Sequence, residues 1–243
     1  MRRAVVVLLA VLLAGAMLPA ARAVSKKKTG VWERELSRGL NIARGNTEQD
    51  EGEVGLRIKR QDEISKFDVS AEAAYGETDS DTTKERAKAS VQYDQQFGPR
   101  PYGSMRVSME YDALADLDYR LIVGPALGYY LVKKEETQLS AELGPSYVRE
   151  SVEGELDDFY VLRLAERFEQ KWGKDAKLWQ TLEYLPDLQA NGKYLLNAEL
   201  GLEAKVTGGI SLRAVVATKH DSRPADDKKR DDTVLKTAIV YKF

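Results

Sequence analysis

The sequence predicts an all-β protein, a transmembrane up-and-down antiparallel β-barrel of about twelve strands. Apolar and polar residues alternate with a period of two in many segments along the chain. The apolar faces of these segments tend to end in aromatic residues. The last segment, residues 233–243, alternates up to the final residue and closes on Tyr241 and Phe243. An aromatic residue at the end of a two-faced terminal strand is typical of a bacterial barrel, so we interpret Tyr241 and Phe243 as its assembly signal.

The clearest alternation lies in residues 194–206. The even positions, from Tyr194 to Val206, are all apolar apart from the tyrosine hydroxyl. The odd positions include Asn197, Glu199 and Glu203. A helix would scatter these two sets around its circumference, whereas a strand places them on opposite faces. This segment is therefore predicted to be a strand with one apolar and one charged face.

Similar alternation predicts the remaining strands. Clear patterns cover residues 67–75, 87–97, 119–131, 139–147, 160–168, 210–216 and 233–243, and weaker patterns cover 32–44, 50–60, 102–112 and 176–186. An even number of strands is what a single-chain bacterial barrel has. Rings such as Tyr75, Tyr129 and Phe168 lie near the ends of apolar faces, where lipid-facing aromatics meet the headgroups.

The first residues read as an export signal. Arg2 and Arg3 precede the apolar stretch 4–18, and Ala21-Arg22-Ala23 has the small residues that a signal peptidase recognises. The stretch is shorter than the roughly 20 residues that a spanning helix needs, although a retained anchor is the alternative. We expect a signal peptide over residues 1–23, a short segment over 24–31 and the barrel over 32–243.

Composition limits the class of protein. The chain has no cysteine, so an exported form contains neither disulfides nor a lipid-modified cysteine. Its net charge of −2 becomes more negative when the arginines of the signal are removed, which argues against nucleic acid as a partner. A mean hydropathy of −0.45 suggests a soluble protein, but half of every barrel strand faces a polar lumen.

Two kinds of connection alternate along the chain. Short turns are predicted at residues 98–101, 133–136, 172–175 and 207–209, and longer or more acidic links at 77–83, 150–158, 186–193 and 220–232. Short turns on one side and longer loops on the other are typical of an outer-membrane barrel with both termini in the periplasm. Residues 45–47 are then an extracellular turn.

The chain resembles the YdiY-like family, often labelled salt-induced outer membrane protein and otherwise a domain of unknown function. The resemblance spans residues 32–243 and is carried by Gly45-Asn46-Thr47, Tyr111-Asp112, Leu117-Asp118-Tyr119-Arg120, Gly124, Gly128-Tyr129, Glu199-Leu200-Gly201-Leu202, Asp232-Thr233 and Tyr241-Lys242-Phe243. The family commonly has Arg-Asp where this chain has Tyr111-Asp112. The resemblance implies an outer-membrane barrel and brings no established activity.

The residues do not indicate catalysis. The single histidine, His220, lies beside the last predicted loop, and Ser222 is too close in sequence to be presented to it across a strand face. An aspartyl-type protease is a weaker alternative. Acidic pairs could hold a divalent cation, but none has calcium-loop spacing. These are Asp79-Ser80-Asp81, Asp157-Asp158, Asp226-Asp227 and Asp231-Asp232. We expect no enzyme, no cofactor and no metal.

The polar faces define the expected lumen. On the assigned parity, the following residues point inward: Arg57, Glu72, Arg106, Glu110, Asp112, Arg120, Glu142, Arg163, Arg167, Glu183, Glu199, Glu203, Arg213 and Lys236. Both signs of charge occur, which argues against strong ion selectivity. Gly124, Gly128, Gly144 and Gly201 also fall on inward positions, where they relieve curvature or leave room for long Arg and Glu side chains.

The predicted function is a small non-selective pore or a structural envelope protein in the cell outer membrane. The alternative is a soluble periplasmic or secreted β-sandwich or barrel that binds a ligand or partner. Expected partners are outer-membrane lipid, lipopolysaccharide and the barrel assembly machinery, with Lys228-Lys229-Arg230 near lipid phosphates. We expect a monomer.

Overall fold

The computed structural model describes residues 30–44, 49–78, 81–225 and 228–243. These contain twelve strands. They are β1 (Val31–Arg44), β2 (Gln49–Gln61), β3 (Ser65–Thr78), β4 (Asp81–Gln96), β5 (Pro101–Asp112), β6 (Leu117–Lys133), β7 (Thr137–Val152), β8 (Glu155–Trp172), β9 (Ala176–Pro186), β10 (Tyr194–Thr207), β11 (Ile210–Asp221) and β12 (Asp231–Lys242). The expected signal over 1–23, most of the segment 24–31 and the turn Gly45-Asn46-Thr47 lie outside the described residues.

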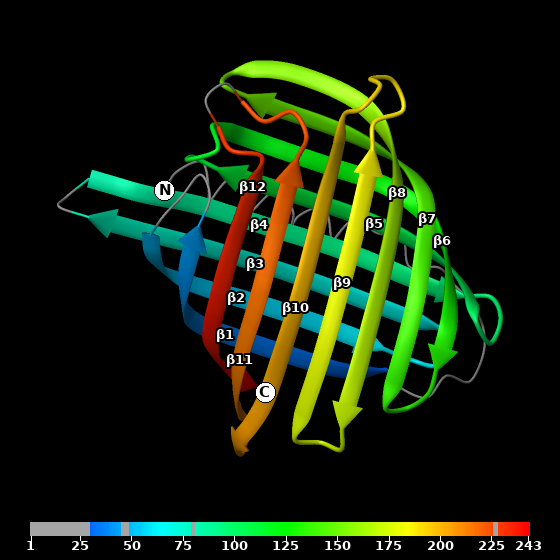
Figure 1. The fold of residues 1–243 in the computed structure, drawn as a ribbon. Helices are drawn as coiled ribbons and strands as arrows, with labels where there is room; N and C mark the ends of the chain where they lie inside the picture. The colour runs from blue at the N-terminus through cyan, green and yellow to red at the C-terminus, as the bar shows by residue number, and fades with distance from the viewer. Residues whose placement is uncertain (1–29, 45–48, 79–80, 226–227) are drawn as a thin grey trace.

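The strands form one closed antiparallel barrel in which each pairs with its neighbours in sequence and β1 pairs with β12 (Figure 1). The predicted twelve-stranded up-and-down barrel is confirmed, and the β-sandwich alternative is wrong. Closure gives every strand two pairing partners, so no sheet edge is left open. Over the ranges that the structure describes, no helix is long and apolar enough to cross a membrane.

The barrel has two different ends. Strands β1, β3, β5, β7, β9 and β11 finish at what we call the loop end, and β1 begins and β12 finishes at the opposite, terminal end. Connections at the terminal end are short, such as 134–136, 173–175 and 208–209. The loop end carries the longer connections 187–193 and 222–230. These connections agree with the expected lengths, but two other predicted links, 77–83 and 150–158, are shorter than expected. Because β3 continues to Thr78 and β4 starts at Asp81, only residues 79–80 connect these two strands.

The predicted acidic link over 150–158 is wrong. β7 continues to Val152 and β8 starts at Glu155, so only Glu153 and Gly154 connect them. Both have positive φ, 54° and 82°, the backbone conformation of a tight type I′ hairpin turn. Acidic residues on either side of the turn belong to the strands, because strand pairing extends over them.

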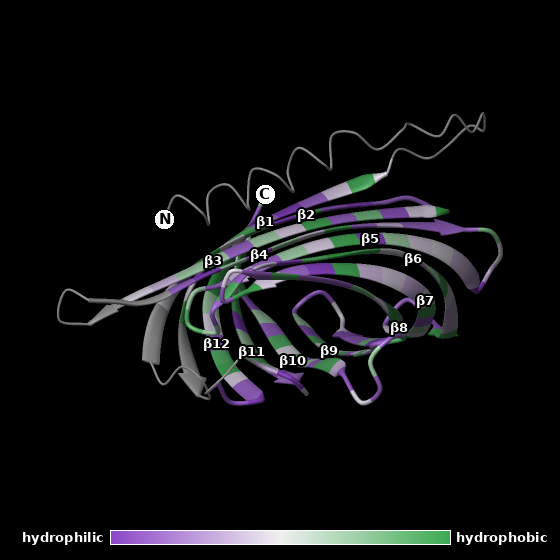
Figure 2. Cartoon of the chain, turned by 90° about the horizontal axis from the view of Figure 1, so that it is seen from above, coloured by the Kyte–Doolittle hydropathy of each residue, from purple (hydrophilic) through white to green (hydrophobic). Residues whose placement is uncertain are grey.

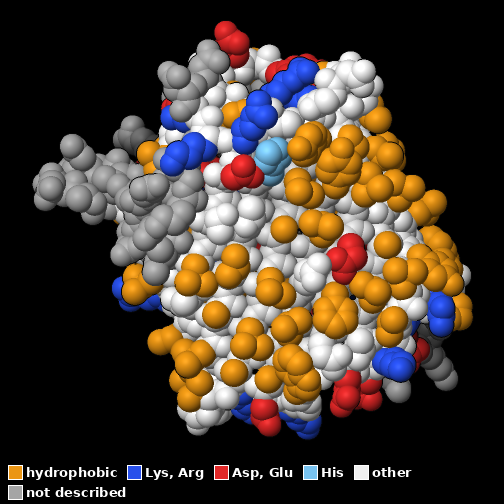
Figure 3. Space-filling view, in the orientation of Figure 1, with side chains coloured by type: hydrophobic (Ala, Val, Ile, Leu, Met, Phe, Trp, Pro, Cys, Tyr) orange, Lys and Arg blue, Asp and Glu red, His pale blue; other side chains and the backbone are white. Residues whose placement is uncertain are grey.

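The two faces of the barrel differ as the alternation predicts. Hydrophilic and hydrophobic residues alternate along the ribbons in Figure 2. Hydrophobic side chains cover much of the outer surface over β9 to β12 (Figure 3). On the outer face of the barrel, Leu127 of β6 is 71% exposed, and Leu200 and Leu202 of β10 are 50% and 47% exposed. Exposed leucines in such number over a whole barrel are typical of a lipid-facing surface.

The seam between β1 and β12 closes the barrel. Ten residue pairs join the strands, from Glu35↔Lys242 to Arg44↔Thr233. The N–H of Phe243 donates to the Arg34 carbonyl at 3.1 Å, and its ring stacks on Tyr241 with 5.7 Å between centroids. The terminal aromatic residues thus lie on the seam.

Candidate functional site in the barrel lumen

The candidate site is the interior of the barrel, which holds two adjoining polar cavities. The first has a volume of about 330 Å³. It is lined by most of the residues expected in the lumen: Arg57, Glu72, Arg106, Glu110, Asp112, Glu142, Arg163, Arg167, Glu183, Glu199, Arg213 and Lys236. The second, about 840 Å³, lies toward the terminal end and is lined by Glu203 among others. Arg120 is buried in an ion-pair cluster near the loop end.

Arg163 on β8 is the centre of the most closely connected charge cluster. Its Nη1 lies 2.6 Å from Glu142 Oε2 on β7, and its Nε lies 2.5 Å from Glu183 Oε1 on β9. Glu142 Oε1 also accepts hydrogen bonds from the Tyr102 hydroxyl at 3.0 Å and from Gln92 Nε2 at 3.2 Å. Because Arg163 is only 5% exposed, these contacts compensate for the loss of water around its charge.

A second charge cluster lies on the lumen side of the seam between β1 and β12. Arg213 Nη2 on β11 contacts Glu35 Oε2 on β1 at 2.6 Å and Glu203 Oε2 on β10 at 2.5 Å. Lys242 on β12 pairs with Glu203 and lies 3.7 Å from Glu35. Four successive strands around the point of closure are therefore linked by opposite charges on the lumen side. These contacts supplement the backbone hydrogen bonds of the seam.

Ion pairs also cross the lumen. Lys219 Nζ on β11 lies 2.8 Å from Glu110 Oε1 on β5, and the two strands are six positions apart around the barrel. Arg120 on β6 contacts Glu150 Oε2 at 2.5 Å and Asp221 Oδ2 on β11 at 3.0 Å. Such bridges place paired side chains across the interior. The lumen is thus partly filled by its own side chains, as expected between eight-stranded barrels and wide porins.

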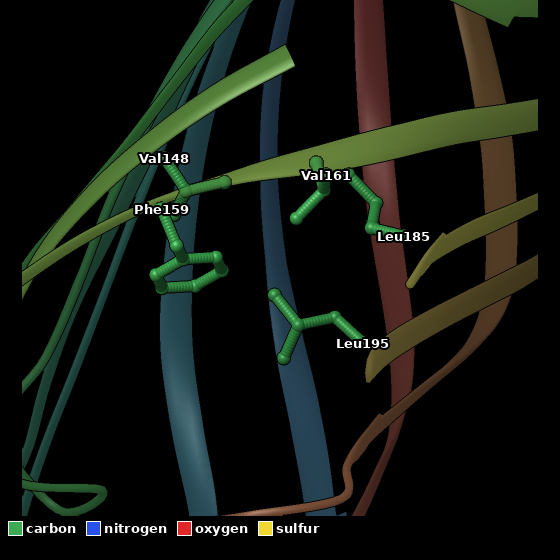
Figure 4. Close-up of a cluster of buried hydrophobic side chains, with 5 residues drawn as sticks. All are labelled: Val148, Phe159, Val161, Leu185 and Leu195. Atoms are coloured by element: carbon green, nitrogen blue, oxygen red, sulfur yellow. The ribbon is translucent and has the colours of Figure 1, made fainter. Parts of the chain in front are cut away.

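An apolar cluster fills part of the lumen near the loop end, which the sequence analysis missed. Figure 4 shows its buried side chains. They are Val148, Phe159, Val161, Leu185 and Leu195. Phe159 and Val161 have the same parity as Arg163 on β8, so parity alone places them inside. They were not predicted because the inward positions were assigned a role only where they carry charged residues or glycine.

Polar contacts surround this cluster at the loop end. Lys193 Nζ lies 3.8 Å from the centroid of the Phe159 ring and 3.0 Å from Asp157 Oδ2. Lys228, which the sequence analysis placed near lipid phosphates, lies 2.5 Å from Asp116 Oδ2 and donates to the Leu114 carbonyl at 2.8 Å. The β11–β12 connection thereby reaches the β5–β6 connection. The apolar cluster and these contacts narrow the loop end of the lumen.

Two inward glycines make room for aromatic rings instead of the long charged side chains expected there. A Cβ on Gly128 would lie 2.2 Å from the Tyr102 ring, and one on Gly201 would lie 2.1 Å from the Trp179 ring. The expectation for these two positions is therefore corrected. The rings lie against bare backbone, and the hydroxyl of Tyr102 and the indole N–H of Trp179 donate to Glu142 and Glu199.

The two residues weighed for catalysis, His220 and Ser222, make structural contacts. His220 Nδ1 lies 2.7 Å from Asp231 Oδ1, and its ring stacks on Tyr194. The Ser222 hydroxyl accepts from the Tyr194 N–H at 2.7 Å. In the described part of the chain, no three acidic or histidine side chains gather as a metal site. Asp79, Ser80, Asp226 and Asp227 lie outside that part.

Fold and lumen together define a closed, twelve-stranded antiparallel barrel with a polar interior. The chain belongs to the family described as protein of unknown function, DUF481, whose model matches residues 36–243. No curated protein matches the chain.

Solved barrels share the fold at low sequence identity. The NanC porin is 9% identical with a TM-score of 0.59, over 86% of this chain and 100% of that one. The KdgM porin in complex with disordered oligogalacturonate is 14% identical with a TM-score of 0.51, over 86% and 99%. The translocator domain of the autotransporter NalP from Neisseria meningitidis is 10% identical with a TM-score of 0.51, over 100% and 94%. At these identities the similarity establishes the fold alone.

Proposed function

We propose that this protein is an outer-membrane barrel that forms a narrow, non-selective pore for small hydrophilic solutes. The outer surface with exposed leucines supports a lipid environment. The observation that carries the pore is the pair of polar cavities inside the barrel, lined by both signs of charge. Both cavities are lined in part by the same residues, among them Lys59, Ser140 and Glu142, so they adjoin.

Further properties belong to the same proposal. The chain is a YdiY-like protein, exported by a signal over residues 1–23 that is removed. It acts as a monomer without a catalytic step or cofactor. Its partners are outer-membrane lipid, lipopolysaccharide and the barrel assembly machinery, for which the terminal aromatics Tyr241 and Phe243 act as the signal. The similarity to porin barrels supports the outer-membrane location, and the family match supports the family assignment.

Conductance in a planar lipid bilayer tests the pore and the effect of the apolar cluster around Phe159 on it. We expect small channels from the folded protein and an increase of roughly twofold or more in single-channel conductance for Phe159→Ala, because apolar constrictions exclude water and ions. Tyr160→Ala is the matched control. It removes an aromatic ring from the next position of β8, where Tyr160 is 53% exposed on the outer surface.

Folded protein is verified by the difference in gel mobility between boiled and unboiled samples in SDS. If folded wild-type protein and folded Phe159→Ala both give no channels, the lumen is closed and the protein is a structural envelope barrel instead of a pore. Equal conductance changes in Phe159→Ala and Tyr160→Ala would contradict the position of the constriction.

A further inference from the structure

Four cationic side chains line the wall where the two cavities adjoin. They are Lys59 on β2, Lys66 on β3, Arg167 on β8 and Lys177 on β9, and each of them lines both cavities. All four lie in the half of the barrel nearer the terminal end. Among the described residues, only two carboxylates, Glu142 and Glu169, line both cavities, so cations outnumber carboxylates on this wall.

In the described part of the chain, the four cations lack the ion pairs that hold lumen cations such as Arg57, Arg163 and Arg213. Within the described ranges, no carboxylate oxygen forms an ion pair within 4.0 Å with any of them. Neighbouring carboxylates are already engaged. Asp68 holds Arg57 through both oxygens, at 2.9 and 2.8 Å. Asp94, the cross-strand neighbour of Lys66, accepts from Gln92 and Ser104.

The carboxylates on the shared wall are occupied in the same way. Glu142 is held by Arg163, Tyr102 and Gln92, and Glu169 by Lys171 at 3.2 Å. Positive charge on this wall therefore exceeds the negative charge that is available to neutralise it. Like charges in a narrow, partly water-excluded space repel one another strongly, and an anion between them would relieve the repulsion.

The topology places the four cations in two pairs that face each other. Lys59 and Lys66 come from the hydrogen-bonded neighbours β2 and β3, and Arg167 and Lys177 from the neighbours β8 and β9. In the closed order, β2 lies six positions from β8, and β3 six positions from β9. An anion in the lumen at this level would therefore have cations on both sides.

We propose that this wall, Lys59, Lys66, Arg167 and Lys177, is a binding site for a small anion that carries two or more negative charges on carboxylate or phosphate groups. Ammonium groups and a guanidinium supply only donors, which suit oxyanions. The inference deepens the proposed pore, because solutes must reach the lumen to bind there. It also predicts that the pore, although non-selective along most of its length, retains such anions at one point.

Trp179 provides a local readout for binding. Its ring lines the first cavity and lies 5.1 Å from Lys177 Nζ. The other two tryptophans, Trp32 and Trp172, are exposed, at 51% and 53%. Citrate or inorganic phosphate is added to the folded protein in detergent micelles. We expect the tryptophan fluorescence to change and the change to saturate as the anion concentration rises. The comparison of the two anions shows whether carboxylates or phosphates bind more tightly, and chloride at equal ionic strength controls for screening.

Single substitutions identify the site. Lys59→Gln and Arg167→Gln are each expected to weaken citrate binding about tenfold, as loss of one charge-assisted hydrogen bond predicts. Arg60→Gln is the matched control, because Arg60 is the next residue of β2 and lies over the exposed Trp32 ring. Both lumen variants are expected to resist urea as well as the wild type or better, because they remove repulsion.

The result that would overturn the proposal is a fluorescence change that does not saturate, or equal citrate affinity in Lys59→Gln, Arg167→Gln and Arg60→Gln. Trp179→Phe must abolish the signal, and a signal that persists would mean binding elsewhere. Failure of the pore is distinguishable from failure of the site. Saturable binding without conductance would support the anion site and reject the pore. Conductance without saturable binding would support the pore and reject the anion site.

Discussion

Replacement of Arg163 by methionine is expected to destabilise the folded barrel by about 3 to 5 kcal/mol, the range for breaking a buried ion pair. The substitution leaves Glu142 and Glu183 in the lumen without the guanidinium that lies 2.6 and 2.5 Å from them. Both carboxylates would have to be charged without their partner or bind a proton. Reversible urea unfolding in lipid vesicles measures the loss, with the gel shift on boiling as a check of folding.

Arg60→Met is the control for this substitution, because Arg60 is exposed on the outer surface and has no part in the lumen clusters. We expect it to change stability by less than about 1 kcal/mol. Adding Glu183→Gln to Arg163→Met should restore part of the loss, since one unpaired charge is removed. Equal stability of Arg163→Met and Arg60→Met would show that the cluster around Arg163 does not form as described.

Leu200→Arg is expected to cost about 2 to 4 kcal/mol, the range for a lipid-facing arginine near the membrane midplane. Leu200 is half exposed on the outer surface of β10, between the lumen-facing residues Glu199 and Gly201. The matched control is Asn197→Arg on the opposite face of the same strand. Asn197 lines the first cavity and donates to Glu183 Oε2 at 3.2 Å, so an arginine there finds a carboxylate nearby.

The same unfolding experiment in vesicles measures both variants. Similar losses for Leu200→Arg and Asn197→Arg would contradict the assignment of the two faces of β10. A larger loss for Asn197→Arg would reverse it.

Much of the fold could be predicted because a strand in a barrel has a period of two. All twelve strands coincide with segments of alternation, including the weak pattern over 176–186, which is β9. The tight β7–β8 turn could not be predicted from charge, because the acidic residues around it belong to paired strands. The tight turn requires a positive φ at Glu153. In the sequence, only the following residue, Gly154, is typical of such a turn.

The sequence allows prediction of which side chains face the lumen, but not of which side chains contact each other there. Parity places Arg163, Glu142 and Glu183 inside the barrel. Which carboxylate pairs with which guanidinium depends on the stagger between strands, and alternation along a single strand does not reveal this stagger. The pair Lys219–Glu110 joins strands that are far apart in sequence. The apolar cluster around Phe159 departs from the expectation of a polar interior, and its role in narrowing the lumen depends on five side chains from four strands meeting.

We infer that one face of every strand contacts lipid and the other faces a water-accessible lumen. A cysteine scan of β10 tests this inference most directly. The chain has no cysteine, so each single variant carries one thiol. In protein folded into lipid vesicles, cysteines at Asn197 and Glu199 should react with a water-soluble maleimide. Cysteines at Leu200 and Leu202 should react only with a lipid-soluble one. Reaction of all four cysteines with the water-soluble reagent would contradict the assignment of the two faces. Reaction of only the cysteines at positions 200 and 202 with this reagent would contradict it as well.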